Sequence, residues 1–352
     1  MTFTRLRNPI HDSNTFLNIL VTLLQEFLLI KSFCFANCSS RKILVDKSFP
    51  YWYHWGLLVN FGVKRMSEKM GRKMPESAYT KAKRIAEETM DAIHALKYKT
   101  PSGRTLSLDK LVTPAVRRSK MYKPDWNEEI SAEKNTSPKI SVTRESTLEA
   151  AYRLSEDNAC VLNFASAKHP GGGFLRGAIA QEESLARSSA LYHTLIEHPE
   201  YYEENKRSGR NGPGIYTDYI IYSPNVPVIR NDRGDWLEDP YIMSVITSPA
   251  PNRTAILEDS DDSTITEDQD KTLEEAFKAR TLRVLNLMAA NGHRSIVLGA
   301  WGCGIFGNDP WKVAKMFKEA LKVCHYFDEV VFAIYDSPDS ETYKAFEKVF
   351  AS

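Results

Sequence analysis

From residue 139 onward, the sequence alternates short apolar segments with segments of helical pattern. Apolar runs of strand length lie at residues 140–143, 160–165, 242–247, 295–300 and 330–335. A helix signal follows each run, either apolar residues at helical spacing or an N-terminal capping residue. Strands that alternate with helices are typical of a sheet covered by helices. The sequence therefore predicts a layered α/β fold for this part of the chain.

Local signals define some of these elements more closely. Residues 146–149 read Ser-Thr-Leu-Glu, the spacing of a capping box, which predicts the start of a helix. One continuous helix is predicted over residues 181–198. Residues 219–222 and 226–229 are predicted to be paired strands, because a Ser-Pro-Asn turn signal separates them.

The charge balance and the cysteine content limit the class of protein. The chain has 352 residues, with 46 Lys and Arg against 45 Asp and Glu, a formal net charge of +1. So little net charge gives no overall field that would hold a nucleic-acid duplex, although a local basic cleft is still possible. The five cysteines are irregularly spaced and indicate no structural zinc site. They fit a reducing compartment, and we expect the cytoplasm or the nucleus.

Residues 1–74 show no clear period and are treated as an N-terminal extension. An apolar run at 16–30 is interrupted by polar residues and is too short for a membrane span. Two arginines precede this run, so an organelle-targeting segment is possible, but an amphipathic helix is the favoured interpretation. From residue 77, apolar residues recur at helical spacing and predict another helix.

A glycine triplet follows the apolar run at 160–165. Residues 163–183 read N-F-A-S-A-K-H-P-G-G-G-F-L-R-G-A-I-A-Q-E-E. Three consecutive glycines allow positive φ and let backbone amides approach an anion such as phosphate, although a flexible surface turn has the same pattern. Adjacent acids at a helix start can simply complement the helix dipole. Beside a phosphate-binding loop, however, one carboxylate could bind sugar hydroxyls while the other transfers a proton.

A second glycine-rich loop follows the run at 295–300. Residues 299–308 read G-A-W-G-C-G-I-F-G-N, and Asp309-Pro310 then gives the signals of a helix start. A loop that ends at a helix N-terminus suits a diphosphate. Phe306 can lie against a ribose or pack in the core. Cys303 is interpreted as a small buried residue, because no histidine lies nearby in the sequence to activate it.

These two motifs resemble the poly(ADP-ribose) glycohydrolase family in its bacterial and fungal form. The resemblance rests on the glycine triplet followed by Gln-Glu-Glu, on G-A-W-G-C-G-I-F-G-N-D-P, and on their order and spacing. It implies a macrodomain-like fold, a three-layer α/β/α sandwich with a mixed central sheet, preceded by a helical N-terminal extension. Residues 75–352 would form the catalytic domain, with a helical accessory region at about 75–138, while residues 1–74 lie outside the resemblance.

The resemblance also implies the reaction and the residues that perform it. The enzyme would hydrolyse ribose–ribose O-glycosidic bonds of poly(ADP-ribose) and release ADP-ribose, without a metal or a cofactor. Glu183 matches the catalytic acid, which would protonate the departing oxygen and then activate water, and Glu182 would position the ribose. The residues expected to bind the substrate are Asn163, Gly171, Gly172, Gly173, Gln181, Gly302, Cys303, Gly304, Ile305, Phe306, Gly307 and Asn308.

A general acid needs a pKa near the working pH. Burial and the neighbouring Glu182 would raise the pKa of Glu183, whereas the helix N-terminus would lower it. We expect the first two effects to prevail.

Three other functions use the same motifs in part. A macrodomain that reads ADP-ribose without cutting it would need no catalytic acid, so the intact Gln-Glu-Glu counts against it. A related hydrolase could remove ADP-ribose from protein or from DNA with nearly the same site. A nucleotide-binding structural protein leaves the paired acids unexplained. The expected partners are poly(ADP-ribose), ADP-ribose and ADP-ribosylated proteins, with no stable membrane or sequence-specific nucleic-acid partner, and the chain is expected to be a monomer.

Overall fold

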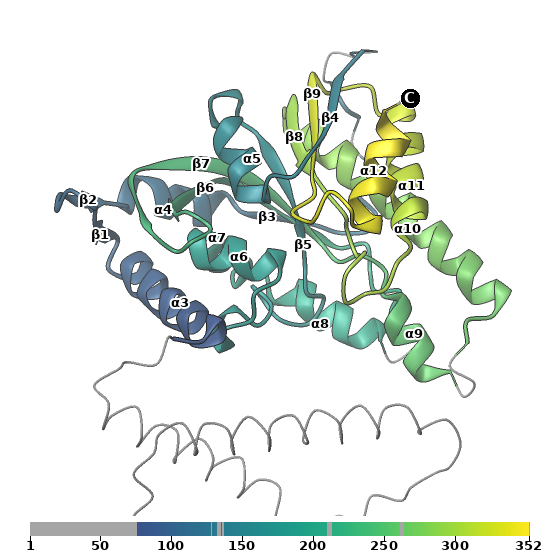
Figure 1. Ribbon diagram of the computed structural model, residues 1–352, viewed down its shortest axis with the longest axis horizontal. Helices are drawn as coiled ribbons and strands as arrows, with labels where there is room; N and C mark the ends of the chain where they lie inside the picture. Colours follow the sequence, from purple (N-terminus) through teal and green to yellow (C-terminus); the bar gives the residue numbers. More distant parts are fainter. Residues whose placement is uncertain are drawn as a thin grey trace, which may run out of the picture. The chain divides into compact units, whose positions relative to one another are not determined.

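A mixed sheet of seven strands runs through the middle of the structure (Figure 1). In spatial order its strands are β3 (Lys120–Tyr122), β6 (Ile220–Arg230), β7 (Trp236–Ser248), β5 (Cys160–Phe164), β8 (Ser295–Leu298), β9 (Glu329–Ala333) and β4 (Lys139–Thr143). The strands from β7 to β4 are parallel to one another, whereas β6 is antiparallel to both of its neighbours. Parallel strands need crossover connections, which explains the helices between them.

The structure is a computed structural model that describes residues 76–351, apart from 128, 132–134, 136, 210–212 and 261–263. The predicted helical N-terminal extension at residues 1–74, with its apolar run at 16–30, lies outside the described residues. Within the described part, no helix combines the length and the apolar character needed to cross a membrane.

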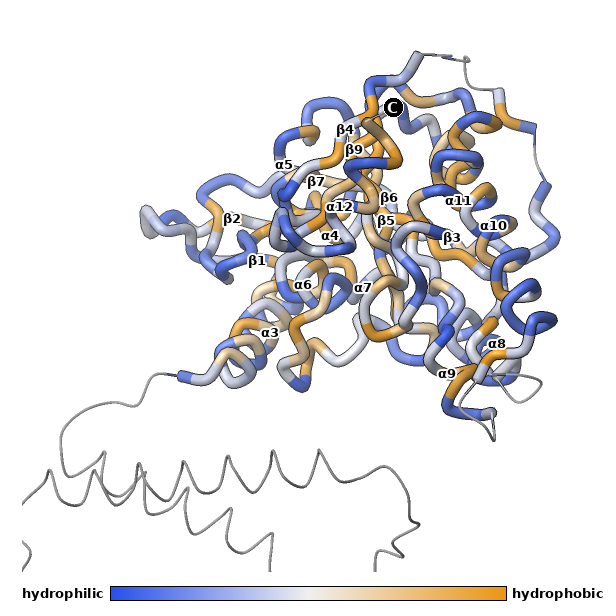
Figure 2. Tube along the Cα trace, turned by 45° about the vertical axis from the view of Figure 1, so that its right-hand side comes forward, coloured by the Kyte–Doolittle hydropathy of each residue, from blue (hydrophilic) through white to orange (hydrophobic). Residues whose placement is uncertain are grey.

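Both faces of the sheet are buried. In β5, Cys160 and Leu162 enter one hydrophobic core, whereas Val161 enters the other, because successive side chains of a strand point to opposite faces. Strands buried on both faces are continuously apolar, as the sequence pattern indicated. Figure 2 shows the central strands mostly in apolar colours and the outer turns of the helices mostly in hydrophilic ones.

Helices cover each face of the sheet and give three layers. One face carries α4 (Asp109–Arg118), α5 (Thr147–Arg153), α6 (Gln181–Ser188) and α7 (Leu191–Leu195). The other face carries α10 (Glu267–Ala290), α11 (Pro310–Val323) and α12 (Glu341–Phe350). The remaining elements are α3 (Ala78–His94), α8 (Pro199–Ser208), α9 (Arg253–Asp259), the hairpin of β1 (Lys97–Lys99) and β2 (Thr105–Ser107), and two short 3₁₀ turns, η1 (Ser155–Asp157) and η2 (Phe174–Arg176). The predicted layered α/β fold is confirmed.

Helix starts follow the predicted capping signals. The Ser146 hydroxyl accepts a hydrogen bond from the Glu149 N–H, and the Glu149 carboxylate accepts one from the Ser146 N–H, which is a complete capping box at α5. Asp309 caps α11, whose first residue is Pro310.

Two predicted elements are wrong, and both errors involve strand β6. The helix predicted over 181–198 is two helices, because the backbone between them turns to meet β6: Ser189 forms a β-bridge with Val228. The paired strands predicted at 219–222 and 226–229 are one strand with a register shift in its middle. The turn signal there is used by a bulge, where Asn225 takes a φ of +51°.

Helix α3 is tied to β6 through a buried charge. Arg230 is 2% exposed, and its guanidinium donates to Glu88 Oε2 at 2.8 Å and to Thr89 Oγ1 at 2.9 Å. The same group lies over the ring of Trp236, 3.3 Å from its centroid. A buried guanidinium is tolerated when its donors are paired. The region predicted as accessory, 75–138, is thus joined to the rest through α3 and through β3 at the sheet edge.

Candidate active site

Two loops leave neighbouring strands at the same edge of the sheet. Residues 165–180 connect β5 to α6, and residues 299–309 connect β8 to α11. Because β5 and β8 are adjacent and parallel, their carboxyl ends lie side by side, which is where ligands bind in open α/β sheets. A cavity of about 460 Å³ lies between the two loops. Its lining includes Ser166, Glu182, Glu183, Gly302, Gly304 and Phe306.

Glu182 lies at the buried side of this cavity. It is 3% exposed; its Oε2 accepts from the Ser166 N–H at 2.7 Å, and its Oε1 accepts from Asn163 Nδ2 at 3.2 Å. Burial raises the pKa of Glu182 from 4.5 to about 8, against the effect of these hydrogen bonds. Glu182 is thus more buried than the half-buried Glu183, and its burial favours the protonated form.

Glu183 is half-buried and is held by the glycine triplet. Its Oε1 accepts from the Gly173 N–H at 2.8 Å. Gly172 has a φ of +61°, and a Cβ there would lie 2.3 Å from Glu183 Oε1 and 3.1 Å from Glu182 Oε2. Only a glycine therefore fits over the two carboxyl groups. A glycine is needed at position 171 for a similar reason, because a Cβ there would lie 2.9 Å from the ring of Phe174.

Gln181 joins α6 to the end of β5. Its Oε1 accepts from the Phe164 N–H at 2.9 Å, and its Nε2 donates to Leu162 O at 2.9 Å and to Thr147 Oγ1 at 3.2 Å. Both polar atoms of the Gln181 amide are therefore hydrogen-bonded within the protein. The side chain thus sets the start of the helix that carries both glutamates.

The second loop is closed at its base by Asn308. Its Nδ2 donates to Gly302 O at 3.0 Å and to Pro251 O at 2.8 Å, and it is 5% exposed. Gly302 has a φ of +74°, and a Cβ there would lie 2.5 Å from Asn308 Nδ2. Gly307 has a φ of +68°, and a Cβ would lie 2.6 Å from Thr254 Oγ1. The glycines of this loop therefore allow it to close on itself and to pack against residues 250–254.

The tip of the second loop is exposed at the cavity. Ile305 is 84% exposed, and a Cβ at Gly304 would meet nothing within 4 Å. Phe306 packs beside Tyr216, with 6.1 Å between ring centroids. Burial raises the pKa of the Cys303 thiol to about 12, so this cysteine is not a thiolate nucleophile.

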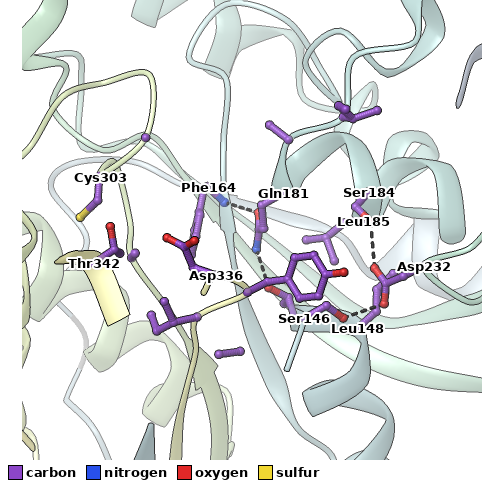
Figure 3. Close-up of a pocket in the computed structure, with 18 of the residues that line it drawn as sticks. Ser146, Leu148, Phe164, Gln181, Ser184, Leu185, Asp232, Cys303, Asp336 and Thr342 are labelled. Carbon is purple, nitrogen blue, oxygen red and sulfur yellow. Dashed lines mark hydrogen bonds between the residues drawn. The ribbon is translucent and has the colours of Figure 1, made fainter. Parts of the chain in front are cut away.

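A second cavity of about 550 Å³ adjoins the first. The second cavity shares Phe164, Ala180, Gln181, Ala300 and Gly304 with the first, so the two cavities lie side by side. In Figure 3, Cys303 and Thr342 lie on one side of the second cavity and Asp232 on the other. Asp232, from the β6–β7 connection, accepts from Ser146 Oγ at 2.6 Å and from Ser184 Oγ at 3.1 Å (Figure 3).

The structure brings some of the predicted site residues to the cavities and places others behind them. The residues that line a cavity are Gln181, Glu182, Glu183, Gly302, Cys303, Gly304, Ile305 and Phe306. Gly171, Gly172 and Gly173 pack against their own loop or the carboxyl groups. Gly307 and Asn308 support the second loop from below. Asn163 is fully buried behind Glu182 and touches it, and within the described residues its Oδ1 has no hydrogen-bond partner.

Sequence reasoning missed three residues of the site. Ser166 holds Glu182 through its backbone N–H, Tyr216 lines the first cavity, and Asp232 lines the second. Asp232 is 48 residues from Ser184 in the sequence, so no local pattern could have connected them. Ser166 follows directly after an apolar strand, which is the one signal that could have indicated it.

Comparisons with known proteins agree with this geometry. A family model described as the microbial-type PARG (poly(ADP-ribose) glycohydrolase) catalytic domain matches residues 86–231. A crystal structure of poly(ADP-ribose) glycohydrolase from Thermomonospora curvata is 41% identical, with 76% of this chain and 99% of that chain covered and a TM-score of 0.69. The enzyme from Deinococcus radiodurans in complex with ADP-ribose is 37% identical, covering 68% of this chain and 96% of that one, with a TM-score of 0.61. No curated protein sequence matches the chain.

The mixed sheet between helical layers, with a glutamate pair under a glycine loop, defines a glycoside hydrolase of macrodomain-like fold. The agreement with the solved structures extends over most of the described part. The chain belongs to the microbial-type poly(ADP-ribose) glycohydrolase family.

Proposed function

We propose that this chain hydrolyses ribose–ribose O-glycosidic bonds of poly(ADP-ribose), with Glu183 as its general acid and base. The observation that carries the proposal is the position of the Glu183 carboxyl, which lies in the cavity between the two glycine loops with one oxygen held by the Gly173 N–H. A Thermomonospora curvata relative has been crystallised with the inhibitor ADP-HPD and a Deinococcus radiodurans relative with ADP-ribose. We infer a similar ligand for this cavity.

The carboxyl groups of Glu182 and Glu183 have different roles in this reaction. Glu183 donates a proton to the departing ribose oxygen while the anomeric carbon gains positive charge, and the resulting carboxylate then takes a proton from the attacking water. Glu182 is protonated near neutral pH, so it donates to a ribose hydroxyl without adding a second negative charge beside Glu183. Asn163 acts on the sugar through Glu182, because its amide touches that carboxyl and does not line the cavity.

The two adjoining cavities set the direction of the substrate. With the scissile ribose at Glu183, the diphosphate lies along the second loop, over the backbone of 302–306. The adenosine end then enters the adjoining cavity, where Asp232 is a hydrogen-bond acceptor and Phe164 lies on the boundary. An extended ADP-ribose thus uses both cavities.

The expected partners follow from this reaction. They are poly(ADP-ribose) and ADP-ribosylated proteins, and we expect a monomer in the cytoplasm or nucleus. The thiols of Cys160, Cys303 and Cys324 are free, which fits a reducing compartment. Light scattering of the purified chain checks the monomer, and a dimer mass would contradict it.

Polymer hydrolysis by the wild type beside Glu183→Gln tests the assignment. The amide keeps the shape of the side chain but has no proton to transfer, so turnover falls by about 10²–10⁴-fold. Calorimetric titration with ADP-ribose should give an affinity within a few fold of the wild type. Glu347→Gln, on the exposed side of α12, is the matched control and keeps full activity.

The rival functions give different outcomes in the same assay. If the protein only bound ADP-ribose, the wild type would bind this ligand but would not shorten the polymer. A hydrolase for another acceptor would act on mono-ADP-ribosylated protein or DNA faster than on polymer. Full polymer hydrolysis by Glu183→Gln would contradict the role of that residue.

A further inference from the structure

Positively charged side chains gather at the mouth of the first cavity, on the side of the glycine triplet. Lys168 and His169 line the cavity together with the two glutamates. A Cβ built at Gly173 would lie 3.7 Å from Glu183 Oε1 and 3.8 Å from Arg176 Nη2, so both side chains lie close to the third glycine of the triplet. The side chains of Lys168 and Arg176 are exposed.

Lys206 of α8 completes this group from another part of the chain. Burial lowers the pKa of His169, and the charges that lower it further are those of Lys206, Arg176 and Lys168, in that order. The charges that act on His169 are therefore all positive, and they come from the first loop, η2 and α8. We call Lys168, Arg176 and Lys206 the basic lip.

The basic lip is not neutralised by the protein itself. On α8, Glu200 pairs with Lys123 at 3.1 Å and Glu204 pairs with Arg207. Within the described part of the chain, no carboxylate lies within 4 Å of the three basic-lip side chains, which belong to none of its ion pairs. Because the whole chain carries a net charge of only +1, this concentration of unpaired cations beside the reacting centre is a local feature.

We propose that the basic lip binds the diphosphate of the polymer unit on the leaving-group side of the scissile bond. This inference rests on the proposed function. The oxygen that leaves belongs to a ribose whose own 5′ carbon carries the next diphosphate, so that anion lies only one sugar ring from Glu183. The bound ADP-ribose unit already has the second loop and the adjoining cavity, and it leaves the basic lip free for the next unit. Cations that contact phosphate oxygens there hold the leaving part of the chain in line with the acid.

The test compares Lys168→Gln/Lys206→Gln with the matched pair Lys97→Gln/Lys348→Gln, which removes two exposed lysines from the hairpin and from the end of α12. Exposed ion pairs are individually weak, so kcat/KM for long polymer should fall about fivefold at low salt. The slope of log kcat/KM against the logarithm of the salt concentration should become shallower by roughly 0.7 for each lysine removed. The affinity for ADP-ribose alone should not change, because this product has no unit on the leaving-group side.

Each outcome has a separate meaning. If the wild type hydrolyses polymer but the lysine pair variant matches the control at every salt concentration, the basic lip has no such role. An equal loss on a mono-ADP-ribosylated acidic peptide would assign the lip to the acceptor protein and overturn the proposal. Loss of ADP-ribose affinity would place the lip in the main site and also overturn it. Absence of polymer hydrolysis in the wild type would instead refute the proposed function.

Discussion

The two glycine loops at the edge of the sheet use their glycines for different purposes. In the loop after β5, Gly172 lies against the carboxyl groups of Glu182 and Glu183, and the Gly173 N–H holds one of them. In the loop after β8, the space for a Cβ at Gly302 is taken by Asn308 of the same loop and by Ala250, which follows β7. The glycines of the first loop therefore make room for the acids, and those of the second make room for its own closure and for residues 250–254.

This difference teaches that similar motifs need not bind a ligand in the same way. A glycine-rich sequence alone predicts exposed amides in both loops. In the structure, the amide of Gly173 is engaged by a catalytic carboxyl, whereas residues 302–306 line the cavity. The substrate's diphosphate is therefore expected on the second loop, and the first loop controls the acids.

The largest effect should come from Glu182, the buried acid at the start of α6. The folded protein raises the pKa of Glu182 from 4.5 to about 8, so below pH 4.5 the carboxyl is protonated in both states, and between these values only the folded state keeps the proton. The contribution of this group to stability is therefore complete below pH 4.5 and is lost as pH rises toward 8, a decrease of about 5 kcal/mol. Thermal unfolding from pH 5 to 9 measures it.

Glu182→Gln is the control for this prediction. An amide resembles the protonated acid in shape and does not titrate, so the variant should lose less stability over the same pH range. A parallel pH dependence of the wild type and the variant would show that Glu182 is not the group responsible.

Next in size is the steric requirement at Gly172. Gly172→Ala places a methyl group 2.3 Å from Glu183 Oε1, so the acid must move, and kcat should fall about 100-fold. Gly292→Ala is a matched control, because Gly292 also has a positive φ, of +81°, but a Cβ there would meet nothing within 4 Å. Steady-state polymer hydrolysis by both variants measures the difference. Equal losses would mean that backbone strain, and not the carboxyl contact, explains the effect.

Removing the closure of the second loop should have a smaller effect. Asn308→Ala removes the hydrogen bonds to Gly302 O and Pro251 O, which costs about 1–3 kcal/mol of unfolding free energy. The loosened loop should raise the dissociation constant of ADP-ribose, while the proton transfer at Glu183 continues. Denaturant unfolding and calorimetry measure the two quantities. A loss of kcat with unchanged ADP-ribose affinity would contradict the division between the loops.

The smallest effect is expected at Gly304. Its Cβ position is open, so Gly304→Ala should change kcat/KM by less than about twofold. A large loss, measured in the same polymer assay, would show that the substrate backbone approaches Gly304 more closely than the cavity indicates.

The layered fold and the positions of the two glycine loops were predictable because they depend on local patterns. Apolar strands predicted β4, β5, β8 and β9 within a residue or two, and capping residues predicted the starts of α5 and α11. The errors arose where distant segments meet. Ser189 leaves the helix to pair with Val228, and the turn signal near Asn225 became a bulge because β7 continues alongside β6.

The same limit applies to the site. The sequence indicated different tasks for the two adjacent glutamates, but not that Glu182 is the more buried of the two. That depends on Ser166 and Asn163, which reach Glu182 from the end of β5 and only in the folded chain. Asp232 comes to the second cavity from the β6–β7 connection for the same reason.

The most direct test of the account is a crystal structure of the Glu183→Gln variant with ADP-ribose bound. The account predicts the anomeric carbon beside residue 183, with an oxygen on that carbon within hydrogen-bond distance of the side chain, about 3 Å. The diphosphate should lie along residues 302–306, and the adenosine should occupy the cavity beside Asp232. An anomeric carbon placed next to Asp232, with the adenosine between the two glutamates, would contradict it.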